Sequence, residues 1–333
     1  MKPRVGIVML TYNTLSKIGE EVFQKILTRL SSIDYDNCRV VIADNGSRDR
    51  TPDFVAEFFN TRSSKCNVEI LRLRKNYGWS GGNNRAAVLL RDSKYILFLN
   101  DDVFIKPDLV SGLVEIMESN PDVGVAQPVV INLDGSHNLG FALSLGLIPS
   151  PITADAIYTH KMHKNLLDVS YAIGAALMTR SDLFFKLGMF DEDYFFWFDD
   201  VDYSLRVWSA GYRVVCVLRH FVYHIGSATF GKTNPKLQYY FSRNFMSLLM
   251  KLPVTSLVAI LPIAIIEYTY VSILHYLRHL DTLGLLYSFI GLKHFVKRAI
   301  GRKLYTSKIR LSINTYRAVA YPHLTAKNLH LLR

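Results

Sequence analysis

Cysteine is scarce in this chain, with three residues in 333. Cys38, Cys66 and Cys216 are odd in number and show no CxxC spacing, which speaks against a disulfide framework and against a zinc site. Unpaired cysteines behave as small hydrophobic side chains and are typical of reducing compartments. We therefore expect three buried, unpaired thiols in a protein of a reducing compartment.

Other familiar signals are also missing. The apolar stretch 5–10 runs directly into a polar Thr-Tyr-Asn turn and is too short for a signal peptide. The chain has no internal repeat and no low-complexity segment. Half of its residues are hydrophobic, which argues against disorder. Its length predicts one large domain with an appended region.

Acidic residues are nearly absent from the last hundred positions. Residues 232–333 hold two acids, Glu267 and Asp281, against fifteen Lys and Arg. Residues 1–231 are close to neutral, with twenty-four basic and twenty-six acidic residues. We expect a catalytic domain over 1–231 and a basic, apolar, helical region over 232–333. Basic residues set among apolar ones favour an anionic membrane surface as partner and not nucleic acid; a solvated pair of basic helices is the alternative.

Residues 254–277 are apolar, with Glu267 as their single charge. Such a length can cross a bilayer, but a glutamate near its middle would be costly there, and Tyr268 and Tyr270 favour a membrane interface. We expect helices that lie in the boundary of the cytoplasmic leaflet, which makes the protein peripheral or monotopic. A transmembrane span is the second possibility, and a buried soluble helix the third.

Short apolar strands alternate with helical patterns over the first 130 residues. The expected strands are 5–10, 40–43, 68–73, 95–99 and 123–129, and the expected helices are 18–30, 52–59, 82–90 and 107–117. Such alternation predicts right-handed βαβ units, and hence an α/β fold with a mostly parallel sheet and flanking helices.

The later elements follow a less regular pattern. We expect a long loop or partly ordered insertion over 132–168, a strand over 169–178, a helix over 181–187 capped by Ser181, a helix over 201–210, and two short strands over 213–217 and 221–223. After residue 231 the pattern becomes helical.

Two acid clusters carry most of the functional information. Asn100, Asp101 and Asp102 follow a buried strand, where open α/β sheets bind ligands. About a hundred residues later, Asp199, Asp200 and Asp202 open an amphipathic helix. One cluster suits a divalent metal that holds a diphosphate, and the other suits a general base. Together they meet the requirement of a sugar-nucleotide transferase.

Polar residues also end two other strands. Thr11-Tyr12-Asn13 and Asp44-Asn45-Gly46-Ser47 place hydrogen-bonding groups where a nucleotide base and ribose could lie. The loop from Asn76 to Asn84 carries glycines and enters a helix, so its amides can approach phosphate closely. It does not have the GxGxxG spacing of dinucleotide-binding proteins.

With these residues in view, the chain resembles the family 2 glycosyltransferases of the GT-A fold, in particular the rhamnosyltransferase-like branch. The resemblance runs from residue 4 to about 230 and rests on Thr11-Tyr12-Asn13, Asp44-Asn45-Gly46-Ser47, Asn76-Tyr77-Gly78, Gly82-Asn83, Leu99-Asn100-Asp101-Asp102-Val103, Gly174-Ala175-Ala176, Gly188-Met189-Phe190-Asp191-Glu192, Phe198-Asp199-Asp200-Val201-Asp202 and His224. The last hundred residues resemble the membrane-associating extensions of such enzymes only loosely.

The resemblance implies roles for these residues. The implied donor-binding set is Thr11, Tyr12, Asn13, Asp44, Asn76, Gly78, Gly82, Asn83, Asn100 and Asp101. Asp102 and His224 match metal ligands, for Mn²⁺ or Mg²⁺. Asp200 matches the catalytic base, with Asp199 as its helper. Asp191 and Glu192 are expected to position the acceptor or its loop, and Trp197 belongs to an aromatic wall suited to an acceptor sugar. Arg206 is expected either to steady the acids or to form a surface ion pair.

The leading hypothesis is an inverting, metal-dependent glycosyltransferase. Its donor would be a UDP or dTDP sugar, such as dTDP-rhamnose or a UDP-hexose, and its acceptor would be lipid-linked or a polysaccharide. The chain lacks the Gln-x-x-Arg-Trp segment of processive synthases, which favours single additions. One alternative is a sugar nucleotidyltransferase, although Thr-Tyr-Asn-Thr stands where a basic, glycine-rich triphosphate loop is expected. The other is a catalytically degenerate membrane scaffold, against which the intact Asp102, Asp200 and His224 argue.

Overall fold

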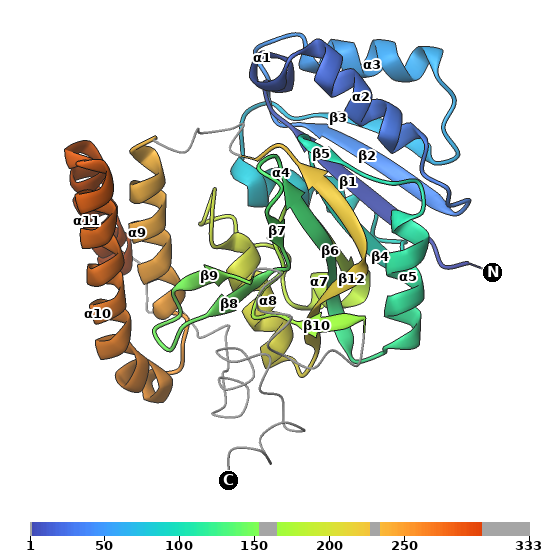
Figure 1. Cartoon of the computed structure of the whole chain (residues 1–333). Coiled ribbons are helices and arrows are strands. Elements are labelled where there is room, and N and C mark those ends of the chain that lie inside the picture. The colour runs from blue at the N-terminus through green and yellow to red at the C-terminus, as the bar shows by residue number, and fades with distance from the viewer. Residues whose placement is uncertain (1, 153–164, 227–233, 302–333) are drawn as a thin grey trace.

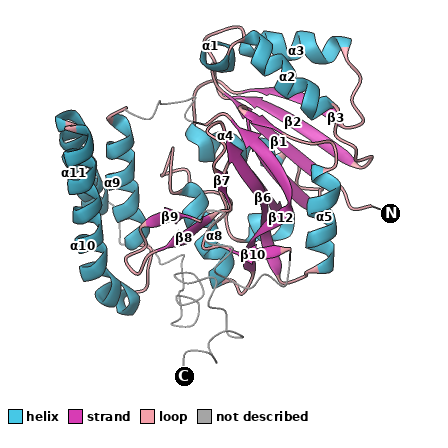
Figure 2. Cartoon of the chain, viewed as in Figure 1, coloured by secondary structure: helices cyan, strands magenta, loops and turns pink. Residues whose placement is uncertain are grey.

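The computed structural model describes residues 2–152, 165–226 and 234–301. A curled sheet carries helices on both faces, and a group of three helices lies beside it (Figure 1). Figure 2 shows the same division, with the strands gathered in one part of the molecule and helices alone in the described residues 234–301. The α/β architecture predicted from the alternating pattern is confirmed.

The main sheet has the strand order β10-β12-β6-β11-β4-β1-β2-β3. Strands β4, β1, β2 and β3 form a parallel run, and β6 and β12 a parallel pair. Strand β11 joins the two parts and is antiparallel to both β4 and β6. The bounds are β1 Val5–Thr11, β2 Cys38–Asp44, β3 Asn67–Arg72, β4 Tyr95–Asn100, β6 Val123–Asn132, β10 Leu166–Asp168, β11 Ala176–Arg180 and β12 Arg213–His224.

Four short strands complete the described sheet structure. Strand β5 (Val103–Phe104) pairs with β12, and β7 (His137–Asn138) pairs with β6. Strands β8 (Phe141–Leu143) and β9 (Pro149–Pro151) form a separate hairpin. The predicted insertion over 132–168 therefore contains β7, β8, β9 and β10, while its residues 153–164 lie outside the described part of the chain.

Helices cover both faces of the sheet. Helices α2, α3 and α5 pack on the face reached by Ile7 and Met9, whereas α4, α7 and α8 pack on the face reached by Val8 and Leu10. This alternation is the period-two pattern of a strand buried on both sides. The bounds are α1 Thr14–Ile18, α2 Glu20–Ser31, α3 Thr51–Thr61, α4 Gly78–Val88, α5 Leu109–Ser119, α7 Ser181–Lys186 and α8 Asp199–Ser209.

Three details of the expected elements are wrong. The strand expected over 169–178 begins only at Ala176, because the preceding backbone bonds elsewhere: Ile173 N donates to the Gln127 side chain. The two strands expected over 213–223 are one strand, β12, with a register irregularity that a sequence pattern reads as a break. Ser181 is not a cap, because it lies inside α7 and its buried hydroxyl has no hydrogen-bond partner among the described residues.

The cysteine expectation is also wrong in part. Cys38 and Cys66 form a disulfide, with their Cα atoms 4.8 Å apart, whereas Cys216 is free and buried as expected. The pairing arises from the sheet. Cys38 begins β2, and Cys66 directly precedes β3, which lies beside β2 in parallel register. Twenty-eight positions separate the two cysteines along the chain, so no local motif reveals the contact. Cysteine usage therefore gives no support to a reducing compartment.

The C-terminal region is helical over its described part, as expected. It contains α9 (Lys236–Leu249), α10 (Val254–His279) and α11 (Thr282–Gly301); residues 302–333 lie outside the description. Within α10, Thr255–Leu274 is long and apolar enough to cross a membrane, and only 11% of it is buried. Among the described residues, most of α10 is therefore exposed, while Ile260 and Ala264 pack against the core.

Glu267, the single acidic residue of α10, is used for docking. The Glu267 carboxylate accepts hydrogen bonds from the Ser144 hydroxyl and from Gly146 N (3.1 Å), both in the turn between β8 and β9. Next to it, the Tyr268 hydroxyl lies 2.6 Å from the Ser242 hydroxyl of α9. One side of α10 thus rests on polar groups of the turn between β8 and β9 and of α9. The other side exposes large apolar side chains, namely Val258, Ile265, Ile266, Tyr270, Ile273 and Leu277.

Candidate functional site

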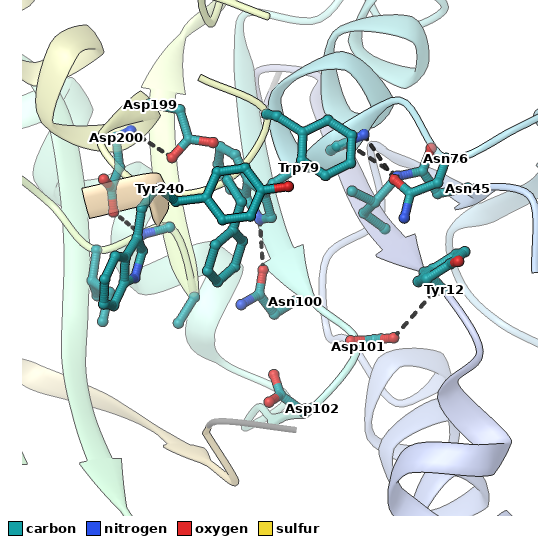
Figure 3. A pocket seen from close by; sticks show the side chains of 18 of the residues that line it. Tyr12, Asn45, Asn76, Trp79, Asn100, Asp101, Asp102, Asp199, Asp200 and Tyr240 are labelled. Carbon is teal, nitrogen blue, oxygen red and sulfur yellow. Dashed lines mark hydrogen bonds between the residues drawn. The ribbon is translucent and has the colours of Figure 1, made fainter. Parts of the chain in front are cut away.

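A cleft of about 540 Å³ opens at the carboxyl ends of β1, β2 and β4. Both predicted acid clusters reach it: Asn100, Asp101 and Asp102 from the end of β4, and Asp199 and Asp200 from the start of α8. Figure 3 shows the pair from α8 and the pair after β4 on different sides of the same space, with Trp79 and Asn100 between them.

The first wall of the cleft comes from strand ends and the loop before α4. Tyr12, Asn45, Asn76 and Gly78 line it. The Asn45 carboxamide donates to Asn76 Oδ1 (3.1 Å) and to the Gly78 carbonyl (3.0 Å), and it accepts from Tyr77 N (2.9 Å). This mutual bonding fixes polar groups in place before any ligand arrives.

Gly78 shows why a glycine stands in this loop. Its φ is +76°, and a Cβ there would collide with the backbone carbonyl oxygen of Phe195. Both features exclude other residues without backbone movement. The glycine therefore lets the loop before α4 touch the loop before α8, so the two walls of the cleft meet here.

Half of the predicted donor-binding residues line the cleft, and half lie behind it. Tyr12, Asn76, Gly78, Asn100 and Asp101 line the cleft, while Thr11, Asn13, Asp44, Gly82 and Asn83 support its loops. For example, the buried Asp44 carboxylate accepts from Ser47 N (3.0 Å) and from the Thr11 hydroxyl (3.4 Å). Gly82 packs so closely on Leu10 that a Cβ would not fit.

Asp102 and His224 face each other. Pairing of β5 with β12 sets His224 opposite Val103, next to Asp102, and His224 Nε2 lies 3.1 Å from Asp102 Oδ1. That oxygen is buried and has no hydrogen-bond partner among the described residues. An unsatisfied buried carboxylate oxygen beside an imidazole nitrogen fits a divalent cation of the Mn²⁺ or Mg²⁺ type. The described residues contain no group of three or more such side chains placed around one point, so a bound cation would take its other ligands from substrate and water.

Asp101 has a different environment from Asp102. It accepts hydrogen bonds from the Thr14 hydroxyl and from Tyr12 N (3.4 Å), which tie it to the first turn of α1. Burial, together with the nearby Asp102 charge, raises the pKa of Asp101 to about 6.

Asp199 and Asp200 form the second acid group. Asp200 Oδ2 accepts from Gly174 N (3.1 Å), and Asp199 Oδ2 accepts from the Ser80 hydroxyl (2.9 Å). Burial raises the pKa of Asp200 to about 6, and burial together with the Asp200 charge raises the pKa of Asp199 to about 7. A carboxylate with a pKa near 6 is ionised at neutral pH yet keeps considerable basicity.

Aromatic side chains form the wall next to this pair. Phe195, Phe196 and Trp197 line the cleft, and Trp197 is 41% exposed. Helix α9 contributes Lys236 and Tyr240 to the same cleft, and the Tyr240 ring stacks on Phe195 at 5.9 Å. No role was predicted for α9 from the sequence; the available signal was the run Tyr239-Tyr240-Phe241, which Ser242 separates from Arg243 and Asn244. Lys17, which lines the cleft, was not predicted either, and Asn45 and Trp79 stand in predicted loops but received no role of their own.

Asp191 and Glu192 do not line the cleft. Asp191 Oδ2 pairs with Lys251 Nζ at 2.5 Å, and Glu192 pairs with Arg85 at 3.0 Å. Both lie directly before the aromatic segment along the chain. Their contacts are those of residues that support a loop.

Asp202 is the buried centre of a third ionic group. Arg206 Nε donates to Asp202 Oδ2 (2.8 Å), and Lys251 Nζ donates to Asp202 Oδ1 (2.7 Å). All three side chains are almost completely buried. Arg206 therefore steadies an acid of the cluster and does not form a surface pair.

Comparison with known proteins gives a consistent result. The model of the glycosyl transferase family 2 matches residues 6–188. The chain is 25% identical over 216 residues to N-acetylglucosaminyl-diphospho-decaprenol L-rhamnosyltransferase of Mycobacterium tuberculosis. This match covers 58% of this chain and 68% of that protein. The chain is also 25% identical over 183 residues to the rhamnosyltransferase WbbL of Escherichia coli K12. This match covers 47% of this chain and 65% of that protein.

Solved structures share the fold at low identity. TarS 1–349 of S. aureus in complex with UDP-GlcNAc matches with a TM-score of 0.60 and 15% identity, covering 88% of this chain and 81% of TarS 1–349. The mannosyltransferase PcManGT of Pyrobaculum calidifontis in complex with GDP-Man and Mn²⁺ matches with a TM-score of 0.54 and 16% identity, covering 100% of this chain and 86% of that protein. GalNAc-T7 with UDP, GalNAc and Mn²⁺ has a TM-score of 0.53 at 14% identity; the match covers 74% of this chain, which spans about half of that protein (47%).

Proposed function

The chain belongs to the glycosyl transferase family 2, and we propose that it is an inverting, metal-dependent transferase that adds single sugars from a UDP or dTDP donor to a lipid-linked or polysaccharide acceptor. One observation carries this proposal: two separate groups of carboxylates reach one cleft, Asp101 and Asp102 from the end of β4, Asp199 and Asp200 from the start of α8. A displacement at a sugar carbon needs one group near the leaving diphosphate and another near the attacking hydroxyl.

The donor would occupy the wall formed by β1, β2 and the loop before α4. Tyr12, Asn45 and Asn76 offer a ring and carboxamides to a nucleotide. The similar structures are complexes with UDP, UDP-GlcNAc and GDP-Man, which supports a nucleoside diphosphate sugar. The names of the two rhamnosyltransferase relatives favour a rhamnosyl donor.

Asp102 and His224 would hold the divalent cation, with Asp101 beside them. When bound, the cation would supply positive charge next to the leaving diphosphate. A histidine ligand favours Mn²⁺ over Mg²⁺. Asn100 would take part through its carboxamide, which already accepts a hydrogen bond from the Trp79 indole (2.8 Å).

Asp200 would take the proton from the acceptor hydroxyl as that oxygen attacks the sugar carbon from the side opposite the diphosphate. Gly174 N fixes one carboxylate oxygen, and burial keeps the group basic. Asp199, held by Ser80, would assist by maintaining the charge of the pair. Trp197 would give the acceptor sugar an apolar surface, while Asp191 and Glu192 would hold the loop that carries it.

The exposed side of α10 and α11 would lie in the boundary of a membrane. Large apolar side chains cover both helices, and the exposed Lys293 and Lys297 of α11 suit anionic headgroups. The docking of Glu267 on the turn after β8 favours this arrangement over a span, because a spanning α10 would draw that polar turn into hydrocarbon. We propose the cytoplasmic face, where nucleotide sugars are available.

The first test is donor binding and slow donor hydrolysis, measured for UDP and dTDP sugars with Mn²⁺, with Mg²⁺ and with EDTA. We expect one donor to bind and to be hydrolysed only with metal. Metal-independent hydrolysis would contradict the proposed cation site, and binding without any turnover would favour a scaffold.

A further inference from the structure

The aromatic segment before α8 has an unusual backbone. Phe195, Trp197 and Phe198 have φ values of 63°, 66° and 69°. Bulky side chains rarely adopt this left-handed region, and such residues persist only where their surroundings enforce the conformation. The strain lies immediately before Asp199 and Asp200, which begin α8. Whatever holds this segment therefore also sets the direction in which those two carboxylates point.

Asn244 of α9 holds the segment through its backbone. Its side chain is completely buried, and its Nδ2 group donates to the carbonyl oxygens of Tyr194 (3.1 Å), Phe196 (2.7 Å) and Trp197 (2.9 Å). These three carbonyls belong to the strained stretch. A carboxamide has two N–H groups, so the three contacts use its whole donor capacity.

Arg243 fixes the orientation of that carboxamide. Its Nε donates to Asn244 Oδ1 (2.8 Å), which leaves the Nδ2 group facing the loop. Its Nη2 donates to the carbonyl oxygens of Asp193 (3.0 Å) and Tyr194 (2.5 Å). Two successive residues of α9 thus form six hydrogen bonds, one between themselves and five to residues 193–197, which lie about fifty positions earlier in the chain.

Lys251 secures both flanks of the same segment. Its buried Nζ donates to Asp191 (2.5 Å) before the strained stretch and to Asp202 (2.7 Å) after it. On the cleft side, Trp79 N donates to the Phe195 carbonyl (2.7 Å) and joins the segment to the donor wall. Carbonyl groups of the loop are therefore held from α9 and from α4, while the side chains of Phe195, Phe196 and Trp197 line the cleft.

We propose that Asn244, oriented by Arg243, is a positioning residue of the transfer reaction. It keeps residues 194–198 in the one conformation that presents Trp197 to the acceptor and Asp200 to the attacked hydroxyl. This inference rests on the proposed function. It also makes α9 part of the catalytic unit, although α9 follows the expected domain boundary at residue 231.

The substitution Asn244→Asp tests the proposal because it removes the three donor contacts while the size of the side chain is kept. It puts a carboxylate oxygen against three carbonyl oxygens. We expect kcat for sugar transfer to fall on the order of 100-fold, the effect of misplacing a catalytic group by about an ångström. We expect the Kd of the metal-bound donor to stay within about threefold, because no described donor-wall residue contacts Asn244.

Asn120→Asp is the matched control. Asn120 Nδ2 also donates to a backbone carbonyl, that of Ile116 (2.9 Å), but at the end of α5 and outside the cleft. The same chemical change should leave kcat unaltered there. If Asn244→Asp does not fold, Asn244→Ser removes the donors without adding charge and carries the same expectation. Circular dichroism and donor affinity, measured on each preparation, report folding.

A folded Asn244 variant with unchanged kcat would overturn the proposal. So would a parallel loss of donor binding and kcat, because that result indicates a general structural role. Failure of the proposed function is recognised separately, in the wild-type protein: without any nucleotide-sugar turnover there, the positioning role falls with it.

Discussion

The two walls of the cleft are built in different ways. The wall proposed to bind the donor comes from residues at the ends of β1, β2 and β4 and from the loop between β3 and α4, within the first 102 positions of the chain. The acceptor wall comes from a strained loop, the start of α8 and one side of α9, and residues about fifty positions apart hold it together. Parallel strands deliver their carboxyl ends to one edge automatically. The acceptor wall has no such scaffold and depends on buried polar contacts.

The walls should therefore fail differently when they are altered. Changes in the donor wall are expected to act on nucleotide and metal affinity. Changes in the acceptor wall are expected to act on kcat with little effect on donor affinity. Asn244 does not line the cleft, yet it holds the loop of the acceptor wall. We therefore expect its substitution to act as a change in the acceptor wall.

The largest effect is expected for Asp200→Asn. Loss of the base should lower kcat about 1000-fold, while the donor Kd stays unchanged because the side chain keeps its size. Transfer from a labelled donor measures the rate. Asp122→Asn, at a largely exposed partner of Arg213, is the control for a surface carboxylate. Preserved transfer in Asp200→Asn would remove the assigned base.

Asp102→Asn should act on the other wall. A neutral ligand in place of a carboxylate is expected to weaken the apparent Mn²⁺ affinity on the order of 100-fold. Donor binding should then no longer respond to EDTA. Titration of donor binding against Mn²⁺ concentration measures this. A variant with the metal dependence of the wild type would show that Asp102 is not a ligand.

The pH dependence sharpens the comparison further. The base must be ionised to act, and burial raises the pKa of Asp200 to about 6 and that of its neighbour Asp199 to about 7. Transfer should therefore fall as pH drops through 6 to 7, reaching about a tenth of its plateau one pH unit below the apparent pKa of the pair. Donor binding, measured at the same pH values, provides the comparison. A transfer rate that stays flat down to pH 4.5 would contradict the buried base.

The smallest effect is expected for a substitution in α10, the helix proposed to lie at the membrane. Glu267→Gln keeps an acceptor oxygen for Gly146 N and the Ser144 hydroxyl but loses its charge. We expect about 1 kcal/mol of lost stability, or a decrease in Tm of about 3 °C, in thermal unfolding of the full chain in detergent. Gain of stability would instead indicate that α10 spans the bilayer, where a neutral side chain is favoured.

Much of the donor wall could be predicted from the sequence. Tyr12, Asn76 and Asp101 follow apolar strands, and the strand positions alone place them at one edge of the sheet. The acceptor wall was predicted only as the pair Asp199 and Asp200 with its neighbouring aromatics. Residues such as Thr11 and Asp44 show the limit of the motif: it identifies the right loops and does not separate side chains that line the cleft from those that support it.

Contacts between distant segments could not be predicted from the sequence either, because they depend on how whole elements pack. The disulfide of Cys38 with Cys66 follows from the pairing of β2 with β3. The bonds from Lys251 to Asp191 and Asp202 follow from the packing of the segment after α9 on α8. Neither the sequence spacing nor the residue types of the partners indicate the disulfide or the two ion pairs of Lys251.

The sequence by itself determined the alternation of strands and helices, the position of both acid clusters and the basic, apolar character of the C-terminal region, because each of these is a local pattern. Only the tertiary structure decided which carboxylates lose their solvent, which side of α10 stays exposed, and that α9 completes the cleft. Burial, backbone strain and ion pairing depend on residues that meet across the fold, and such meetings are set by the packing of whole elements against one another.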